Sequence, residues 1–592
     1  MSIVKQIKVA VIASLNAAFA NEFSENDFQI NQTKPEFEGD YTVVLFSLVK
    51  SLKKSPDEIG NTLGATLLKN HEDLFSDFNI IKGFLNLSIN DLYWLQLLSN
   101  NFNDSCYGKQ AMNGKKVMVE YSSPNTNKPL HLGHLRNNFL GWSVAEILKA
   151  NGYEVLKSCI VNDRGIHICK SMIAWQLFAN GATPESTGKK GDHFVGDYYV
   201  KFNDEYKKQV AELKASGSSE ADAEKNAPIM LQTQQMLQDW EAGKADVIEL
   251  WKKMNGWVYQ GFDVTYKTIG SDFNKIYYES DTYLLGKDIV QEGLHKNVFH
   301  KKDDGSVWID LTSDGLDEKL VLRKDGTSVY ITQDIGLAKQ KYDQYKIDQS
   351  IYVIGDEQNY HMKVLKLIAQ RLQLPYADDI YHLSYGMVEL PTGKMKSREG
   401  TVVDADDLVE EMISTAQAHT EALGKVKDFS QDELIDLYKT IGLGAMKFYL
   451  LRVDPKKKMI FNPEESIDFH GFTGPFIQYS YARIKSILRK ETSLNTPSIF
   501  SEKLLPGEKA VLYTLEQFPS TIVDAAFELN PSVIANYLFT LAKNFNSLYA
   551  ELSIANAESA EKKQLRLQIS MMTAQVLNSG LQLLGIGVPE RM

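Results

Sequence analysis

The sequence predicts an α/β protein with a parallel-sheet domain that carries insertions, an α+β domain before it and an all-α domain after it. Three observations lead to this prediction. A strand–helix–strand pattern covers residues 116–161, short strand signals return between residues 306 and 390, and the chain beyond Asp406 reads as helix almost throughout. A chain of 592 residues is also too long for one hydrophobic core, and its length suggests about three or four domains.

The composition is that of an ordinary globular protein, with 43% hydrophobic and 24% charged residues. The three cysteines, Cys106, Cys159 and Cys169, form no Cys-x-x-Cys pair, which argues against a disulfide framework and a zinc ribbon. We therefore expect no structural metal and a reducing, cytoplasmic compartment. No uninterrupted apolar run approaches the roughly 18–20 residues of a membrane span, so we expect no membrane association.

The first predicted element is an amphipathic helix. Hydrophobic residues recur every four positions, at Ile3, Ile7, Val11, Leu15 and Phe19. We prefer this helix to the signal peptide that the early lysines and an Ala-Phe-Ala imitate. The alternating stretch "FNIIKGFLNLSIN" (78–90) predicts a strand, and the polar stretch 101–116 marks a boundary, so the first domain is placed at residues 1–109.

The strongest local pattern is a βαβ unit. Lys116–Tyr121 is predicted as a buried strand, Leu135–Ala150 as a helix ended by Gly152, and "EVLKSCIV" (154–161) as the next strand. This pattern predicts a Rossmann-type parallel sheet that binds ligands at the carboxyl ends of its strands. We assign residues 110–405 to this domain.

Later segments complete the organisation. Residues from about 180 to 260 turn polar and helical and are predicted to be an insertion. Strand signals then return at "SVWIDL" (306–311), "KLVLR" (319–323), "SVYIT" (328–332), "SIYVIG" (350–355) and "YHLSYGMVEL" (381–390). Residues 406–592 are predicted to form a separate helical domain.

A first functional motif, His131-Leu132-Gly133-His134, lies at the mouth of the predicted helix. Gly133 would let a flat adenine or ribose approach the backbone, while the imidazoles and the helix N-terminus would favour phosphate oxygens. The four residues alone could equally be chance or core histidines. Their position after a strand and the loop "SSPNTNKP" makes that alternative improbable.

A second motif follows the last strand, in "PTGKMKSREGTVVDADDL" (391–408). Lys394, Lys396 and Arg398 crowd a loop between glycines. Read alone, this is a lysine-rich surface turn. Together with the first motif, it suits a loop whose cations offset charge on a leaving pyrophosphate.

These two motifs, with "VNDRGIH", "GDHFVGDYYVKF", "VYITQDIGLA", "YVIGDEQNYH", "GFTGPFIQYSYARI" and "GVPERM", resemble the class I arginyl-tRNA synthetases over essentially the whole chain. The resemblance implies an N-terminal domain that contacts the tRNA elbow, a catalytic domain and a helical anticodon-binding domain. It implies formation of arginyl-adenylate from arginine and ATP, with Mg²⁺ accompanying ATP, then transfer of arginine to the terminal adenosine of its tRNA. It further implies a monomer, and activation that requires bound tRNA.

The resemblance also implies an arginine site. Its residues would be Glu120, Ser123, Asn125, His131, Tyr330, Asp334 and Gln358. A guanidinium needs carboxylates, and Glu120 and Asp334 each follow or end a predicted strand. The alternatives for these two are an ion pair or a helix cap, Asp334 capping a helix from Ile335. Glu357 could replace Gln358 under a one-residue shift.

The ATP site implied by the resemblance contains His131, Gly133, His134, His361, Met395 and Ser397, and the catalytic set contains Lys128, His131, His134, Lys394, Lys396 and Arg398. Ser397 stands where most class I enzymes have a lysine, although arginyl enzymes commonly lack it. We expect Lys128 to supply the missing cation, the alternative being a solvated loop lysine. Asn162, Asp163 and Gly165 either shape an adenosine pocket or form a plain turn.

RNA binding rests on the late part of the chain. The net charge of −12 argues against a nucleic-acid binder, but Asp454–Met459 and Tyr481–Lys490 concentrate positive charge. Aromatic and basic residues alternate on one predicted helix, at Tyr479, Tyr481, Arg483, Lys485 and Arg489. The pattern suits base stacking and phosphate contact, and equally suits an amphipathic helix with aromatic packing; the family resemblance favours RNA.

Two rival functions fit parts of the sequence. A nucleotidyltransferase shares the His-x-Gly-His layout and releases pyrophosphate, but it leaves the helical third of the chain unexplained. A catalytically inactive RNA-binding relative would not need the residues that are intact here, namely Glu120, His131, Gly133, His134 and Asp334.

Overall fold

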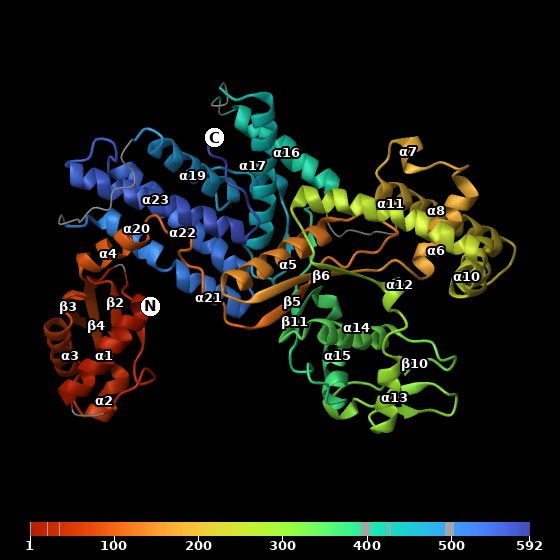
Figure 1. The fold of residues 1–592 in the computed structure, drawn as a ribbon, viewed down its shortest axis with the longest axis horizontal. Helices are drawn as coiled ribbons and strands as arrows, with labels where there is room; N and C mark the ends of the chain where they lie inside the picture. The colour runs from red at the N-terminus through yellow and green to blue at the C-terminus, as the bar shows by residue number, and fades with distance from the viewer. Residues whose placement is uncertain are drawn as a thin grey trace.

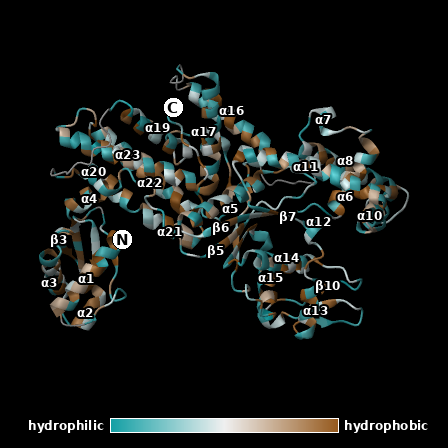
Figure 2. Cartoon of the chain, in the orientation of Figure 1, coloured by the Kyte–Doolittle hydropathy of each residue, from teal (hydrophilic) through white to brown (hydrophobic). Residues whose placement is uncertain are grey.

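The structure is a computed structural model that describes residues 2–19, 22–34, 36–391, 403–422, 424, 428–491 and 503–592 (Figure 1). The N-terminal domain, in red to orange, stands beside the helical domain, and the parallel sheet lies at the centre of the molecule. Hydrophobic residues gather inside these layers, while hydrophilic residues are frequent on their outer faces (Figure 2). Among the described helices, none has the length and apolar character needed to cross a bilayer.

The N-terminal domain packs helices on an antiparallel sheet of strand order β1-β2-β4-β3. Its elements are α1 (Ile3–Phe19), β1 (Ile30–Gln32), β2 (Tyr41–Val44), α2 (Phe46–Leu52), α3 (Pro56–Asn70), β3 (Phe75–Ile81), β4 (Phe84–Ile89) and α4 (Asp91–Asn101). The predicted N-terminal helix is confirmed, with Ile3, Ile7, Val11 and Leu15 on its buried face. The single strand predicted over 78–90 is wrong, because Lys82 and Gly83, both at positive φ, turn the chain into a hairpin.

The central sheet has five parallel strands in the order β12-β11-β5-β6-β7. Its strands are β5 (Lys116–Glu120), β6 (Glu154–Val161), β7 (Lys275–Tyr278), β11 (Gln349–Gly355) and β12 (Ile380–Tyr385). The predicted βαβ unit is confirmed, although its helix α5 (Leu132–Ala150) begins three residues before the expected Leu135. Because all five strands are parallel, their carboxyl ends meet at one edge.

The insertion between β6 and β7 is helical, as the sequence predicts. Its elements are α6 (Ile166–Phe178), α7 (Pro184–Thr187), α8 (Gly191–Ala215), α9 (Glu220–Asn226), α10 (Pro228–Glu241) and α11 (Ala245–Ile269). Helices α8 and α11 pack closely, because Gly191 and Gly261 leave room where a Cβ would meet Trp257 O at 2.0 Å and Asp192 Oδ1 at 2.3 Å. This bundle reaches the central sheet from one end (Figure 1).

The segment between β7 and β12 contains a small antiparallel sheet, β10-β9-β8. Its elements are α12 (Glu279–Thr282), α13 (Lys287–His295), β8 (His300–Lys301), β9 (Val307–Ile309), the 3₁₀ turn η1 (Thr312–Asp314), β10 (Lys319–Leu322), α14 (Tyr330–Tyr345), the 3₁₀ turn η2 (Asp356–Gln358) and α15 (Asn359–Arg371). The strand predicted at "SVYIT" (328–332) is wrong. Val329 is the N-cap of α14, and Ile331, Ile335 and Ala338 form its buried helical face.

The C-terminal part is helical, apart from β14 (Met459–Ile460), which pairs with β13 (Val388–Glu389). Its helices are α16 (Ala405–Ala422), α17 (Gln431–Leu451), α18 (Pro463–Ser466), α19 (Gly474–Leu488), α20 (Pro506–Glu516), α21 (Phe518–Glu528), α22 (Pro531–Glu551) and α23 (Ala560–Leu583). It is bonded to both other parts. The Ile3 backbone N–H donates to Glu516 Oε1 at 2.7 Å, and Ser143 Oγ of α5 donates to Leu583 O at 2.7 Å.

Candidate active site

Helix α5 begins at the carboxyl edge of the sheet with His131 as its N-cap. His131 Nδ1 accepts a hydrogen bond from the Gly133 backbone N–H at 3.1 Å, and His134 Nδ1 accepts one from the His131 backbone N–H at 3.2 Å. A Cβ on Gly133 would lie 3.0 Å from His131 Cε1 and would crowd the imidazole ring, so glycine at this position avoids a close contact. Because both Nδ1 atoms are acceptors, we assign the proton of each neutral ring to Nε2, where it can be donated to a ligand.

Both imidazoles are neutral at physiological pH. Burial, reinforced by the charge of Lys128, lowers the pKa of His131 to about 3. Burial and then the neighbouring His131 and Lys128 lower the pKa of His134 well below its usual range. The pair can therefore act as hydrogen-bond donors without bringing positive charge of its own.

The loop before α5 is held in a strained shape. Ser122 and Ser123 have φ values of 78° and 46°, in the left-handed region that side chains other than glycine rarely adopt. The Ser122 N–H donates to Asn137 Oδ1 at 2.5 Å, which fixes this turn from α5. Asn125 forms an isolated parallel bridge with Asn162, just beyond β6. Ser123 and Asn125 thus lie at the ligand-binding edge of the sheet.

Lys128 lies close to the two histidines, since its charge acts on the pKa of each. It is half-buried, and with His131, Tyr199 and Asp404 it lines a cavity of about 200 Å³. Its ammonium is thus within the electrostatic reach of any phosphate bound by His131.

The five predicted residues of the second motif, Lys394, Met395, Lys396, Ser397 and Arg398, lie outside the described residues. Val403, the next described residue, is hydrogen-bonded to the first motif. The Leu132 N–H donates to Val403 O at 3.2 Å, and the Ala405 N–H donates to Leu130 O at 3.0 Å. The end of the second motif is therefore paired with the backbone on both sides of His131.

Glu120, predicted to bind arginine, is engaged by the protein itself. Its Oε2 lies 2.6 Å from Lys341 Nζ, and the side chains are 7% and 1% exposed. Although burial opposes it, the charge of Glu120 raises the pKa of Lys341 above its usual range. The alternative of an ion pair is what the structure shows for this carboxylate; a contact with arginine stays a prediction.

Asp334 lies inside α14, so the predicted strand before it and the alternative of a helix cap at Ile335 are both wrong. Its Oδ2 lies 2.6 Å from His361 Nε2 on α15. Tyr330, one helical turn earlier and therefore on the same face as Asp334, is 72% exposed. Gln358 and Glu357 are both exposed in η2, directly after β11, and the choice between them stays open.

Glu279 is a candidate that the sequence reasoning missed. It begins α12 immediately after β7, at the same sheet edge. Burial raises its pKa to about 7, against the charge of Arg164 and with the charges of Asp163 and Asp334. A cation placed between Glu279 and Asp334 would relieve this mutual repulsion. Only the end of the short strand "KIYY" before it could have indicated this position.

The turn after β6 contains three candidate residues, Asn162, Asp163 and Gly165, and Asp163 has a structural role. Asp163 accepts hydrogen bonds from Ser280 N–H at 2.8 Å, Ser280 Oγ at 2.7 Å and Tyr259 Oη at 2.8 Å. Its carboxylate is therefore satisfied by α11 and α12. Asn162 Nδ2 donates to Ser123 O at 3.3 Å, and Gly165 has open space where a Cβ would stand.

Comparison with known proteins identifies the family. The family model "tRNA synthetases class I (R), catalytic domain" matches residues 96–462, "DALR anticodon binding domain" matches 477–592, and "Arginyl tRNA synthetase N terminal domain" matches 5–89. A curated relative from Amoebophilus asiaticus, named arginine–tRNA ligase, is 51% identical over 597 residues that cover 100% of both chains. Another of that name, from Flavobacterium psychrophilum, is 52% identical over 605 residues, again over 100% of both.

The chain belongs to the arginyl-tRNA synthetase family. The fold of a solved arginyl-tRNA synthetase from Thermus thermophilus matches it with a TM-score of 0.78, at 24% identity, over 99% of this chain and 100% of that one. The arginyl-tRNA synthetase of Plasmodium falciparum matches with a TM-score of 0.76, at 17% identity, over 100% and 99%. The predicted resemblance and the fold class are confirmed.

For a member of this family, helix α19 is the predicted tRNA-binding element, and the structure divides its residues. Tyr481 is buried, with its hydroxyl donating to Glu590 Oε1 at 3.1 Å, so it packs inside the domain as the alternative foresaw. Lys485 Nζ lies 3.3 Å from Glu590 Oε2. Arg489 is exposed at the end of the helix and donates to Glu590 O at 2.7 Å.

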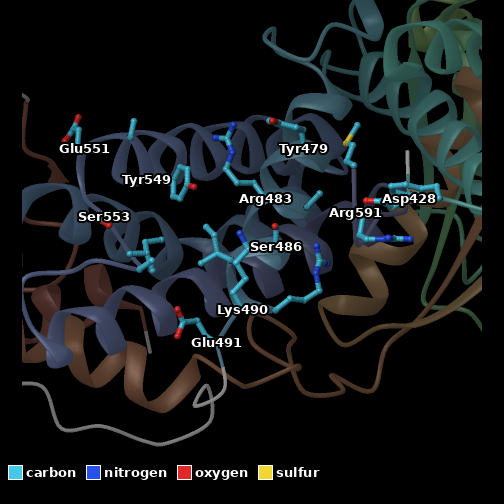
Figure 3. Close-up of a pocket in the computed structure, with 18 residues that line it drawn as sticks. Asp428, Tyr479, Arg483, Ser486, Lys490, Glu491, Tyr549, Glu551, Ser553 and Arg591 are labelled. Carbon is cyan, nitrogen blue, oxygen red and sulfur yellow. The ribbon is translucent and has the colours of Figure 1, made fainter. Parts of the chain in front are cut away.

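The other side of α19 faces a large hollow of about 910 Å³ (Figure 3). Tyr479, Arg483, Arg489, Lys490 and Tyr549 are among its lining residues. The Arg483 guanidinium lies 4.9 Å from the Tyr479 ring and 5.5 Å from the Tyr549 ring. The arginyl-tRNA synthetase fold thus presents aromatic rings and cations together at a concave surface of its anticodon-binding domain.

Proposed function

We propose that the chain is an arginine–tRNA ligase that works in two steps. An arginine carboxylate oxygen attacks the α-phosphorus of ATP, which enters as its magnesium complex, and the bond to pyrophosphate breaks. A ribose hydroxyl of the terminal tRNA adenosine then attacks the arginyl carbonyl, and AMP leaves. The observation that carries the proposal is the His131–His134 cap at the sheet edge where α12 and α14, with Glu279 and Asp334, also begin, in a chain of this family.

Arginine would bind with its guanidinium between the carboxylates of Asp334 and Glu279. The raised pKa of Glu279 supports this, because a cation bound there restores the ionised form and gains the interaction of both charges. The exposed ring of Tyr330 would cover the aliphatic stem of the substrate. Ser123, Asn125 and Gln358, at the same edge, would receive its polar end. Glu120, at the end of β5, would border this site while it stays paired with Lys341.

ATP would lie over the start of α5. Nε2–H groups of His131 and His134 would donate to phosphate oxygens, and Gly133 would let the nucleotide approach the backbone. Lys128, Lys394, Lys396 and Arg398 would offset the charge on departing pyrophosphate, while Met395 and Ser397 complete the loop and His361 borders the site. The positive charge at this site would come from these cations, because the two histidines are neutral.

The tRNA would contact the hollow beside α19 through Tyr479, Arg483 and Arg489, with Lys485 nearby and Tyr481 as packing support. The N-terminal domain would contact the tRNA elbow. We further propose that the protein acts as a cytoplasmic monomer. Support for the tRNA contact at α19 comes from the anticodon-binding match and from the aromatic and cationic lining of the hollow.

The deciding experiment is charging of bulk tRNA with radiolabelled arginine and ATP. We expect acid-precipitable arginine to accumulate, and pyrophosphate to form with arginine but not with lysine or citrulline. Citrulline lacks the charge that two carboxylates require, so a strong preference is expected without proofreading. Pyrophosphate release without arginine would favour a nucleotidyltransferase, and tRNA binding without any charging would favour an inactive RNA-binding relative.

A further inference from the structure

A partly buried group of charged residues joins the helical insertion to the end of the second motif. Lys190, the N-cap of α8, lies with its Nζ 2.5 Å from Asp406 Oδ2, 3.0 Å from Asp192 Oδ2 and 2.6 Å from Thr265 Oγ1 of α11. The Thr265 hydroxyl also donates to Asp406 Oδ1 at 2.9 Å. Although burial works against it, hydrogen bonds from His193 and Lys190 lower the pKa of Asp406 to about 2. One ammonium therefore ties three elements together.

The group is not built for a metal ion. Asp192, His193 and Asp406 lie close enough to share a cation. The Lys190 ammonium already supplies that cation, with three oxygen partners at hydrogen-bond distance. A divalent ion would need to displace this hydrogen-bonded ammonium, so the amine is the cation of this cluster.

Asp406 stands two residues after Asp404, whose backbone is paired with the first motif. Asp404 forms an antiparallel bridge with His131, and the flanking bonds are Leu132 N–H to Val403 O and Ala405 N–H to Leu130 O. Asp404 Oδ1 also accepts the Asp406 N–H at 2.8 Å, at the start of α16. Residues 403–406 therefore form a short bracket with Lys190 on one side and the His131 backbone on the other.

Helix α8 also contacts the loop before α5 directly. A Cβ on Gly196 would lie 2.9 Å from Pro129 Cδ, so the helix backbone runs directly against the segment that carries Lys128. The contact is apolar and leaves the orientation of that segment to the ionic group one turn earlier. Both contacts come from the insertion, whereas the proposed guanidinium carboxylates are on α14 and α12.

We propose that Lys190 is a positioning residue for arginine activation: through Asp406 it holds residues 403–406, and these hold the backbone that aims the His131 imidazole. The inference rests on the proposed function. His131 would act on phosphate charge that grows during the reaction, and a misplacement of 1 Å at such a group can cost about a hundredfold in rate. The guanidinium would bind at Asp334 and Glu279, on other elements, so KM for arginine should change much less than kcat.

The test is arginine-dependent ATP–pyrophosphate exchange on the full chain with tRNA present. Lys190→Met should lower kcat by about tenfold to a hundredfold, with KM for arginine changed less than about twofold. Lys190→Arg, which keeps the charge and donors, should recover most of the rate. Lys189→Met is the matched control: it removes a neighbouring lysine whose ion pair with Asp197 is on the surface, and wild-type kcat is expected.

Asp406→Asn guards against a variant that does not fold, because the amide keeps the shape of the side chain and removes the negative charge that Lys190 and His193 contact. It should reproduce the kcat loss, and the double variant Lys190→Met/Asp406→Asn should lose little more than either single one, since both break one interaction. Melting temperatures of all variants are measured alongside.

A pH profile gives a readout that a purely structural role would not move. His193 Nε2 lies 3.1 Å from Asp406 Oδ2 and 3.3 Å from Asp404 Oδ2, and the Asp406 hydrogen bond raises its pKa. The charged groups around it are Lys190, Asp192, Asp404 and Asp406, with Lys128, Asp197 and the neutral His131 across the adjoining cavity. In Lys190→Met, protonated His193 is the cation that remains beside Asp404 and Asp406. The kcat of this variant relative to wild type should therefore be partly restored at about pH 6, where His193 is more protonated than at pH 8.

Three results would overturn the inference. They are wild-type kcat in both Lys190→Met and Asp406→Asn, a matching rise in KM for arginine, and Lys190→Arg as impaired as Lys190→Met. A wild-type chain that charges no arginine would instead overturn the proposed function, before any variant is compared.

Discussion

His361 Nε2 lies 2.6 Å from Asp334 Oδ2, so an imidazole expected beside ATP holds a carboxylate expected beside arginine. The contact joins α15 to α14 at the edge of the sheet and fixes the direction of the Asp334 carboxylate. This hydrogen bond would couple the two proposed substrate sites.

Asp334→Asn keeps the shape of the side chain and removes its charge. If the carboxylate binds the guanidinium, kcat/KM for arginine should fall by about 2–4 kcal/mol, while KM for ATP moves far less. Steady-state exchange at varied arginine and varied ATP measures both. The double variant with His361→Gln should be less than additive, because the two side chains are bonded. Equal losses for both substrates would point to a structural role.

Glu120→Gln tests the role of the carboxylate that pairs with Lys341. Removing its charge leaves the Lys341 ammonium buried without a counterion, and the free energy of unfolding should fall by about 3–5 kcal/mol. Urea denaturation followed by tryptophan fluorescence measures the change. Adding Lys341→Met should restore part of the stability. A fully stable Glu120→Gln with weak arginine binding would instead support direct contact with the substrate.

Lys128→Ala tests the cation beside the histidines. Without it, charge on pyrophosphate is less well stabilised, and kcat for activation should fall about a hundredfold with arginine binding nearly intact. Introducing Ser397→Lys into that variant should recover part of the loss. Single-turnover adenylate formation at saturating arginine is the measurement. Full activity of Lys128→Ala, or a defect confined to arginine affinity, contradicts the role.

The two histidines make stability depend on pH. The folded pKa of His131 is about 3, whereas an unfolded histidine titrates near 6.5. Below pH 6.5 the unfolded chain therefore takes up protons that the native chain refuses, so stability falls as pH falls, by about 1.4 kcal/mol per pH unit for each such histidine. His131→Asn should make the fall between about pH 6 and pH 4 shallower in urea denaturation. An unchanged slope would mean that His131 is protonated in the folded protein.

Arg489→Ala tests the nucleic-acid surface. Removing an exposed cation from the rim of the hollow should raise KM for tRNA several-fold and reduce the salt dependence of tRNA binding by about one unit of slope. Tyr481→Phe is the matched comparison, because its buried hydroxyl contacts Glu590 and should not affect tRNA affinity. Filter binding at several salt concentrations decides. Identical salt slopes for wild type and Arg489→Ala would remove Arg489 from the interface.

Local patterns were enough for parts of the fold and of the site. The strand, loop and helix around His131 could be predicted because their signals lie within about twenty residues, and periodicity reports such short-range structure well. The stretch 328–332 was wrongly predicted as a strand because Val329, Tyr330 and Ile331 are residue types that favour strands. It begins a helix instead, because Ile331, Ile335 and Ala338 are buried at helical spacing.

Partners far apart in the chain could not be predicted. Glu120 and Lys341 are separated by 221 residues, and no local pattern indicates that one neutralises the other. Glu279 has the same difficulty, since its raised pKa arises from burial and from charges on other elements. The ionic group around Lys190 likewise appears only when α8, α11 and the start of α16 are brought together.

The hydrogen bond from the Ile3 backbone to Glu516 has a consequence for synthesis of the chain. Its partners are 513 residues apart, so the first helix is exposed on the ribosome long before its acceptor exists. At about 5–20 residues per second, that interval is roughly half a minute to nearly two minutes. Until then one face of the nascent N-terminal domain is uncovered, which makes the early chain a natural client for chaperones that shield newly made domains.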